Sequence, residues 1–319
     1  MKILSQKSNL KSVIDKRREL VFLYSVRESN PNGDPDDENR PRTDDEGYAL
    51  VSDVRIKRTI RDYWLSNGEK VLVRREYDAE GGIYDMDQLI NEALKDQNKI
   101  DRNIIMEKIP QICLDARIFG FVGTVKDANC SLTGPVQFGI GKSLNKPTVT
   151  THAITSVISA AKKTGGAMGT FHILDYALFR VEGVVCPKLA EISKMTNEDL
   201  LKLYTGLWKG TQTINTRSKF NHVPKLLLSF RSKDAEFLIG ELAYRLDIEE
   251  NENKNEDPIL IFDKLIEKVE KIGKKYIEAV EYLEYIGFKM KYKDNIYDSF
   301  EKLWKNTPLK DIPLEKIQL

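Results

Sequence analysis

A continuous apolar run near the N-terminus, closed by turn-forming residues, constrains this fold more than any other feature. Leu20–Val26 reads LVFLYSV, and its β-branched and aromatic residues predict a buried strand. The segment Arg27–Pro35 follows at once, and its Pro31, Gly33 and Pro35 forbid a continuing strand ladder. We therefore expect a buried sheet strand that ends in a tight loop.

The rest of the chain mixes helical and strand-like segments. A helix is expected from an N-cap at Ser52 or Asp53 to Gly68, because apolar residues recur there at helical spacing. Strands are expected at Ile112–Val125, Pro135–Ile140, Phe171–Val185 and Pro224–Phe230, with a hairpin arm at Thr148–Ile158. Further helices are expected over residues 85–108, Thr196–Lys209 and Pro258–Ile286.

The order of these segments predicts the fold class. It lacks the regular βα alternation of a doubly wound sheet. It favours an α+β fold with an antiparallel sheet, of which the ferredoxin-like or RRM-like split βαβ is one arrangement.

The distribution of charge says more than the formal net charge of +1. Glu28–Glu46 carries eight acidic and two basic residues, and Asp247–Asp257 carries six acidic and one basic. The remainder of the chain therefore has a net charge of +12. A basic body favours a polyanionic partner, although scattered solvated lysines would produce the same sum.

Membrane and secretory classes are disfavoured. The chain is 41% hydrophobic, which supports a sizeable core, yet no stretch approaches eighteen uninterrupted apolar residues. Met1–Arg18 lacks an apolar signal region, and the three cysteines are too widely spaced to form a disulfide framework. We expect a cytoplasmic protein with no membrane partner.

The motifs for familiar catalytic and cofactor sites are incomplete. Gly139–Ser143 resembles the end of a phosphate-binding Walker A loop, but the required earlier glycine is Val136. The histidines are far apart and no CxxC is present, so neither zinc nor another cofactor is expected. An acidic loop offers oxygen ligands for Mg²⁺, although a tight solvated turn explains it better; its residues are Asp34, Asp36, Asp37 and Glu38.

Several motifs together indicate a family. They are Asn30–Pro35 (NPNGDP), Leu50–Arg61 (LVSDVRIKRTIR), Asp115–Gly120 (DARIFG), Gly134–Gln137 (GPVQ), Met168-Gly169 and His172–Gly183 (HILDYALFRVEG). In this order, over roughly residues 20–230, the chain resembles the guide-RNA-binding Cas7 backbone subunits of type I CRISPR Cascade complexes. The C-terminal part is more similar to subtype I-B than to I-C.

The resemblance implies one elaborated domain over residues 1–319, shaped like a right hand. Its parts would be an RRM-like palm, fingers at about 66–110, a thumb hairpin at about 141–168 and a C-terminal helical part at about 258–319. Such subunits stack head-to-tail along crRNA, and each thumb displaces one base while the others pair with target DNA. The implied protein is not an enzyme, and its other partners are the Cascade large subunit, small subunit and 5′-handle-capping subunit.

A guide must be held without reading its sequence, so contacts should go to phosphate and sugar. Lys57 and Arg61 lie one helical turn apart, about 6 Å along the axis, close to the phosphate repeat of an extended strand. Ser52, at the helix start, can donate to phosphate, and the free N–H groups beside it favour an anion. The predicted RNA-binding set is Ser52, Arg55, Lys57, Arg58, Arg61, Arg117, Lys162, Lys163, Gly165 and Gly166.

Two members of this set depend on where the chain places them. Arg117 is expected in a strand, where an arginine among apolar neighbours should contact phosphate or an interface carboxylate. In the thumb, Lys162 and Lys163 could reach phosphates, and Gly165 and Gly166 could bring the backbone close to RNA. Val149 and Ile154 are the expected wedges between bases.

Two other hypotheses remain open at this point. Asp34 occupies the position of a catalytic aspartate in related type III backbone subunits, so a metal-dependent endoribonuclease is one rival. A solitary RNA-binding RRM protein is the other, and the absence of the usual stacked aromatics of RNP1 disfavours it.

Overall fold

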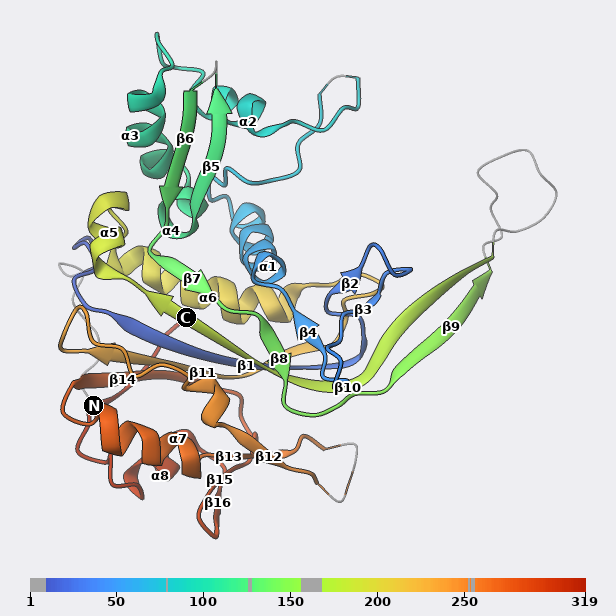
Figure 1. Cartoon of the computed structure of the whole chain (residues 1–319), viewed down its shortest axis with the longest axis vertical. Helices are drawn as coiled ribbons and strands as arrows, with labels where there is room; N and C mark the ends of the chain where they lie inside the picture. The colour runs from blue at the N-terminus through green and yellow to red at the C-terminus, as the bar shows by residue number, and fades with distance from the viewer. Residues whose placement is uncertain (1–9, 79, 126–127, 156–167, 252, 254–255) are drawn as a thin grey trace.

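The computed structural model describes residues 10–78, 80–125, 128–155, 168–251, 253 and 256–319. A nine-stranded sheet runs through the described part of the molecule (Figure 1), with β1 (Arg18–Ser29) at its centre. Its main path is β17-β14-β11-β1-β10-β8-β4, and β7 and β9 also pair with β10. Every pairing in this sheet is antiparallel except that of β14 with β17, as the sequence predicts for its fold class.

The two faces of β1 explain why the middle of its sequence, from Leu20 to Tyr24, is apolar without alternation. Phe22 and Tyr24 point to one face, which is covered by α1 (Asp53–Ser66) and α6 (Asn197–Thr213). Val21 and Leu23 point to the other face, which packs against the C-terminal elements. A strand buried on both faces has no polar side, so the alternation of a half-exposed strand is absent.

Both covering helices begin where the sequence predicts. Ser52 is the N-cap of α1 and accepts a hydrogen bond from the Arg55 N–H, while Thr196 forms a capping box with Asp199 at α6. The two helices approach closely at Gly206, because a Cβ there would lie 2.8 Å from the Cγ2 of Ile60. This close contact fixes α1 against α6, and so helps to fix the side chains that α1 presents.

A separate cluster lies beyond the edge of the main sheet (Figure 1, upper part). It comprises α2 (Met86–Ala93), α3 (Arg102–Ile112), β5 (Gly120–Val125) and β6 (Ala128–Thr133). The predicted strand over Ile112–Val125 is wrong in its first half, because α4 (Leu114–Phe119) precedes β5. The Asp115 carboxylate accepts hydrogen bonds from the Leu72 and Val73 N–H groups, and this tertiary anchor outweighs the strand-like composition.

The C-terminal part also differs from the prediction of one long helix over Pro258–Ile286. That stretch forms β13 (Ile259–Ile261), α7 (Asp263–Lys268), a π-helical turn η2 (Val269–Gly273) and β14 (Ile277–Glu284). β14 continues the main sheet beside β11 (His222–Ser232). The region after residue 258 is therefore rich in strands, and its other elements are β15 (Met290–Tyr292), β16 (Asn295–Tyr297), α8 (Phe300–Lys305) and β17 (Leu314–Lys316).

A long hairpin projects from the sheet (Figure 1, right). Its arms are β9 (Val149–Thr155) and the first part of β10 (Met168–Val185), which pair from Leu174↔Val149 to Met168↔Thr155. Shorter elements complete the fold: β2 (Gly33–Asp34), β3 (Arg40–Pro41), β4 (Leu50–Val51), β7 (Val136–Phe138), β8 (Gly141–Ser143), α5 (Pro187–Ser193), η1 (Ala243–Arg245) and β12 (Asp247–Glu249).

Candidate nucleic-acid interface

The loop after β1 is a tightly bonded turn that reaches the start of α1. Asn32 Oδ1 accepts hydrogen bonds from both the backbone N–H and the hydroxyl of Ser52, each at 2.9 Å. Asp34 Oδ1 accepts from the Arg42 guanidinium at 3.0 Å and from the Asp36 N–H at 3.2 Å. The predicted tight turn is confirmed here, and Ser52 is already fully bonded within the chain.

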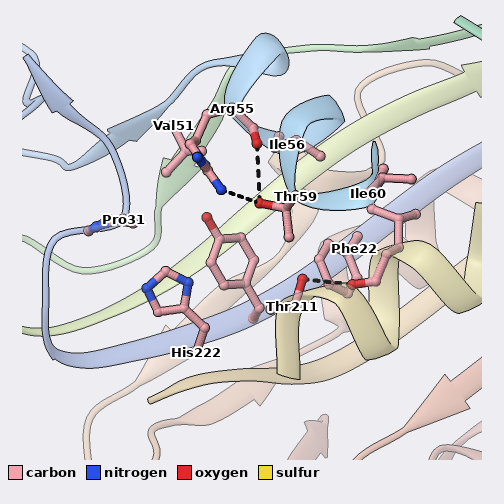
Figure 2. A pocket seen from close by; sticks show the side chains of 11 residues that line it. Phe22, Pro31, Val51, Arg55, Ile56, Thr59, Ile60, Thr211 and His222 are labelled. Carbon is pink, nitrogen blue, oxygen red and sulfur yellow. Dashed lines mark hydrogen bonds between the residues drawn. The ribbon is translucent and has the colours of Figure 1, made fainter. Parts of the chain in front are cut away.

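Arg55 emerges from the first turn of α1 beside this loop. Its guanidinium donates to the Thr59 hydroxyl at 2.9 Å and lines a small cavity of about 20 Å³ with Pro31 and His222 (Figure 2). Among the described residues no carboxylate forms an ion pair with Arg55. Burial lowers the pKa of Arg55, and the charge of Asp62 opposes this shift without cancelling it, so the cation is disfavoured by desolvation.

A second cation reaches the same place from the segment before β11. Burial, followed by the charge of Arg55, lowers the pKa of Lys219. No described carboxylate forms an ion pair with Lys219 either. Burial and the charges of Lys219 and Arg55 together lower the pKa of His222 to about 3, so its imidazole is neutral at physiological pH.

The segment that carries Lys219 is fastened to the end of β1. Ser29 bonds His222 Nε2 at 2.9 Å and donates to the Ser218 carbonyl at 3.0 Å, and the Asn30 N–H donates to the same carbonyl. Like charges repel, so two cations are held together here by hydrogen bonds and not by mutual attraction. Such an arrangement is stabilised when an anion binds between them.

Aromatic side chains lie beside the segment that carries Lys219. Arg217 lies 4.7 Å above the ring of Phe171, on the β10 arm of the hairpin. The other arm supplies His152, whose ring stacks on Phe171 at 5.1 Å between centroids. Phe220, two residues before β11, is 54% exposed. Cations interleaved with exposed aromatic rings are typical of surfaces that bind single-stranded nucleic acid.

Lys57 and Arg61, the predicted phosphate stripe, are engaged elsewhere. Lys57 Nζ lies 3.1 Å from Asp53 and 3.0 Å from Gln137 Oε1. Arg61 donates to the Asp115 carboxylate at 2.8 Å, and Asp115 is fully buried. These two side chains connect α1 to Gln137 in β7 and to Asp115 in α4. This junction between the main sheet and the α2–α3–β5–β6 cluster is called the neck below.

Arg117 completes this neck. It lies in α4 and not in a strand, and its guanidinium makes a two-pronged contact with the Asp199 carboxylate at 2.8 and 2.9 Å. It also donates to the Pro110 and Gln111 carbonyls. The expected carboxylate partner of Arg117 is therefore found within the same chain.

The remaining predicted residues are placed as follows. Arg58 is exposed and pairs with Asp62 at 2.6 Å on the same helix. Val149 is half-buried against the main core at the hairpin base. Lys162, Lys163, Gly165 and Gly166 lie outside the described residues, as does the side chain of Ile154.

Neither a metal cluster nor a membrane span stands out in the part of the chain that the structure describes. There, no group of three or more His, Cys, Asp or Glu side chains is arranged to hold a metal ion. None of the described helices is both long and apolar enough to cross a bilayer.

The interface contains residues that the sequence analysis did not select: Lys219, Arg217, Phe171 and His222. Residues 214–222 read INTRSKFNH, so two cations and an aromatic ring precede a strand within one short segment. That signal was present but is weak, because such a loop is usually solvated. The segment becomes significant because Lys219 lies near Arg55 in the fold, although Arg55 is 164 residues earlier in the chain.

The fold and this site define a class of protein: an antiparallel α+β fold with a projecting hairpin and two neighbouring half-buried cations, Arg55 and Lys219, whose site is called the cleft below. Comparison with known proteins narrows the class. The chain belongs to the Cas7 family, because the model of the family "CRISPR-associated protein Cas7" matches residues 16–268. The predicted family is thereby confirmed, whereas the I-B subtype stays a prediction.

One relative and two solved structures are similar to the chain. CRISPR-associated protein Cas7 of Haloferax volcanii is 29% identical over 303 residues, which cover 85% of this chain and 86% of that protein. A chain of a CRISPR RNA-guided surveillance complex in a pre-nicking state superposes with a TM-score of 0.54 at 14% identity, covering 90% of this chain and 97% of its own. A chain of another CRISPR RNA-guided surveillance complex gives a TM-score of 0.51 at 13% identity, covering 95% of each chain.

Proposed function

We propose that this protein is a non-catalytic backbone subunit of a CRISPR RNA-guided surveillance complex. Several copies stack head-to-tail along crRNA, hold its phosphates and leave its bases free to pair with target DNA. Family membership and the surveillance-complex structures that share the fold support this assignment. The cytoplasm is the expected compartment, and the other partners are the large, small and 5′-handle-capping subunits.

The observation that carries the proposal is the pair Arg55 and Lys219. Two half-buried cations that form no ion pair with a described carboxylate are costly in the free protein, and a phosphate between them relieves both the desolvation and the repulsion. Contacts to phosphate carry no sequence information, which suits a guide of any sequence. In this arrangement Lys57, Arg61 and Arg117 support the cleft and do not line it.

The palm, fingers and thumb of the proposed hand can be assigned to elements of this fold. The main sheet with α1 and α6 serves as the RRM-like palm, the α2–α3–β5–β6 cluster as the fingers and the β9–β10 hairpin as the thumb. The thumb residues Ile154, Lys162 and Lys163 remain its proposed wedge and phosphate contacts.

Salt dependence of RNA binding tests the phosphate site. Each phosphate neutralised on single-stranded RNA contributes about 0.7 to the slope of log affinity against log salt concentration. Arg55→Ala and Lys219→Ala should each lower that slope by about 0.7 per bound subunit, equally on RNAs of different sequence. The matched control is Arg58→Ala, which removes an exposed arginine of the same helix that pairs with Asp62.

Light scattering tests assembly. RNA should convert the free protein into multimers whose length follows that of the RNA, because head-to-tail contacts do not close on themselves. A closed dimer that is indifferent to RNA would overturn the scaffold proposal. An unchanged salt slope in both the Arg55 and Lys219 variants would overturn the phosphate site alone.

A further inference from the structure

The first half of the loop after β1 is hydrogen-bonded to the start of α1, the helix that carries Arg55. Asn32 is 9% exposed, and its single Oδ1 accepts both hydrogen bonds that Ser52 can donate. Its own carbonyl accepts from the Arg42 N–H at 3.0 Å, which joins it to the return strand of the loop. The side chain of Asn32 therefore locks the residue on which α1 begins.

The Ser52 hydroxyl connects Asn32 directly to Arg55. Because the Ser52 hydroxyl hydrogen is directed to Asn32, its lone pairs remain for the Arg55 N–H, which donates to it at 3.3 Å. Arg55 is the third residue of α1, so this bond fixes the backbone from which its guanidinium extends. Asn32, Ser52 and Arg55 form a continuous series from the loop to the cleft.

The loop that presents Asn32 is itself held in one conformation. A Cβ on Gly33 would lie 2.1 Å from Asn39 Oδ1, so only glycine fits beneath the turn. Glu38 and Asn39 at the tip both adopt left-handed backbone angles, with φ of 47° and 58°. Asn30 Nδ2 holds that tip by donating to the Asn39 carbonyl at 2.7 Å. A rigid support of this kind is what precise placement of a binding group requires.

We propose that Asn32 is a positioning residue for RNA binding: through Ser52 it sets the place of the Arg55 guanidinium, so that it meets one phosphate of the guide. This inference rests on the proposed phosphate site. It assigns the Asn30–Asp34 motif to orienting a cation that lies 23 positions away from Asn32, and it gives Asp34 the supporting role of holding the return strand through Arg42.

The test exploits the fact that Asn32 is uncharged. Asn32→Ala should lower the salt slope of oligoribonucleotide binding by about 0.7 per subunit and weaken affinity about tenfold, although no charge is removed. The slope is measured by fluorescence anisotropy on a short labelled oligoribonucleotide with the full-length chain. Asn67→Ala is the matched control, since Asn67 Nδ2 bonds the Tyr63 carbonyl at the other end of the same helix.

Further variants separate placement from a general loss of stability. Ser52→Ala removes the same relay and should reproduce the lowered slope, whereas Ser52→Thr keeps the hydroxyl and should restore it. In an Arg55→Ala background, Asn32→Ala should change neither slope nor affinity further, because nothing is left to position.

The outcomes are distinguishable. If Arg55→Ala itself leaves the slope unchanged, Arg55 meets no phosphate and the positioning role fails; the phosphate site as a whole fails only if Lys219→Ala leaves the slope unchanged as well. If Arg55→Ala lowers the slope while folded Asn32→Ala and Ser52→Ala do not, only the positioning role is overturned. If Asn32→Ala weakens binding additively with Arg55→Ala, or no more than Asn67→Ala does, its role is confined to folding. Should Asn32→Ala fail to fold, the two Ser52 variants decide the matter.

Discussion

Two groups of basic residues, each with one member on α1, behave in opposite ways. In the neck, Arg61 and Arg117 each meet a buried carboxylate, Asp115 and Asp199. In the cleft, Arg55 and Lys219 are half-buried beside each other, and neither forms an ion pair with a described carboxylate. The first arrangement holds parts of the chain together, whereas the second lowers stability until an anion arrives. A cation's partner, and not its position on a helix, therefore marks a binding role.

The largest expected effect lies in the neck. Arg117→Ala leaves Asp199 buried without its partner, so the free energy of unfolding should fall by about 3 kcal/mol. Urea denaturation measures this loss. In the folded fraction, the salt slope of RNA binding should not change. An Arg117→Ala variant with full stability but a lowered slope would show that Arg117 binds RNA, contrary to the contrast drawn between the two groups.

Removing the cleft charge should have the reverse effect on stability. Arg55→Met keeps an aliphatic chain in the site and removes a cation that burial disfavours, so the free energy of unfolding should stay equal or rise by up to about 1 kcal/mol. The same variant should lose about 2 kcal/mol of RNA affinity. A clear loss of stability in Arg55→Met would show that the arginine holds the fold, contrary to the proposed role.

Acid should act on the cleft through His222. Its pKa is about 3 in the folded protein and about 6.5 when unfolded, so the unfolded chain binds more protons between these values. Stability should therefore fall as pH drops below about 6.5, by about 2 kcal/mol at pH 5 from this group alone. His222→Gln should remove that share of the pH dependence. Equal pH profiles for the two proteins would contradict the assigned burial.

The smallest expected effect concerns Asp34. Its carboxylate is occupied by Arg42 and the Asp36 N–H, so it shapes the loop. With Mg²⁺ and bound guide, complementary RNA should remain uncut by the wild type and by Asp34→Asn alike. Products at regular spacing that the variant fails to make would favour the endoribonuclease alternative.

Sequence reasoning succeeded where the signal is local. The N-caps of α1 and α6, the strands β1 and β10 and the turn after β1 are specified by residues close together in the chain. Of the predicted RNA-binding set, Arg55 lies in the cleft, whereas Lys57 and Arg61 do not. Helical spacing put all three on α1 correctly, but it carries no information on the elements that pack around them.

The error at Pro258–Ile286 has a specific cause. The segment Ile277–Glu284 reads IEAVEYLE, and its glutamates look like the polar face of a helix. In the fold Glu281 is 7% exposed, and it receives hydrogen bonds from Arg18, Arg231 and Tyr204. A buried carboxylate with such partners is compatible with an inner strand, and tertiary context overrides the helical pattern.

Local sequence patterns suffice for the family, the antiparallel α+β class, the central strand and the helix that carries the cations. Which of these cations can bind an anion depends on how the chain folds. Arg61 and Asp115 are 54 positions apart, Arg117 and Asp199 are 82 apart, and Lys219 is 164 positions from Arg55, whose charge acts on it. Ion pairing and burial act over a few ångströms of space, and separation along a chain does not reveal which charges come that close.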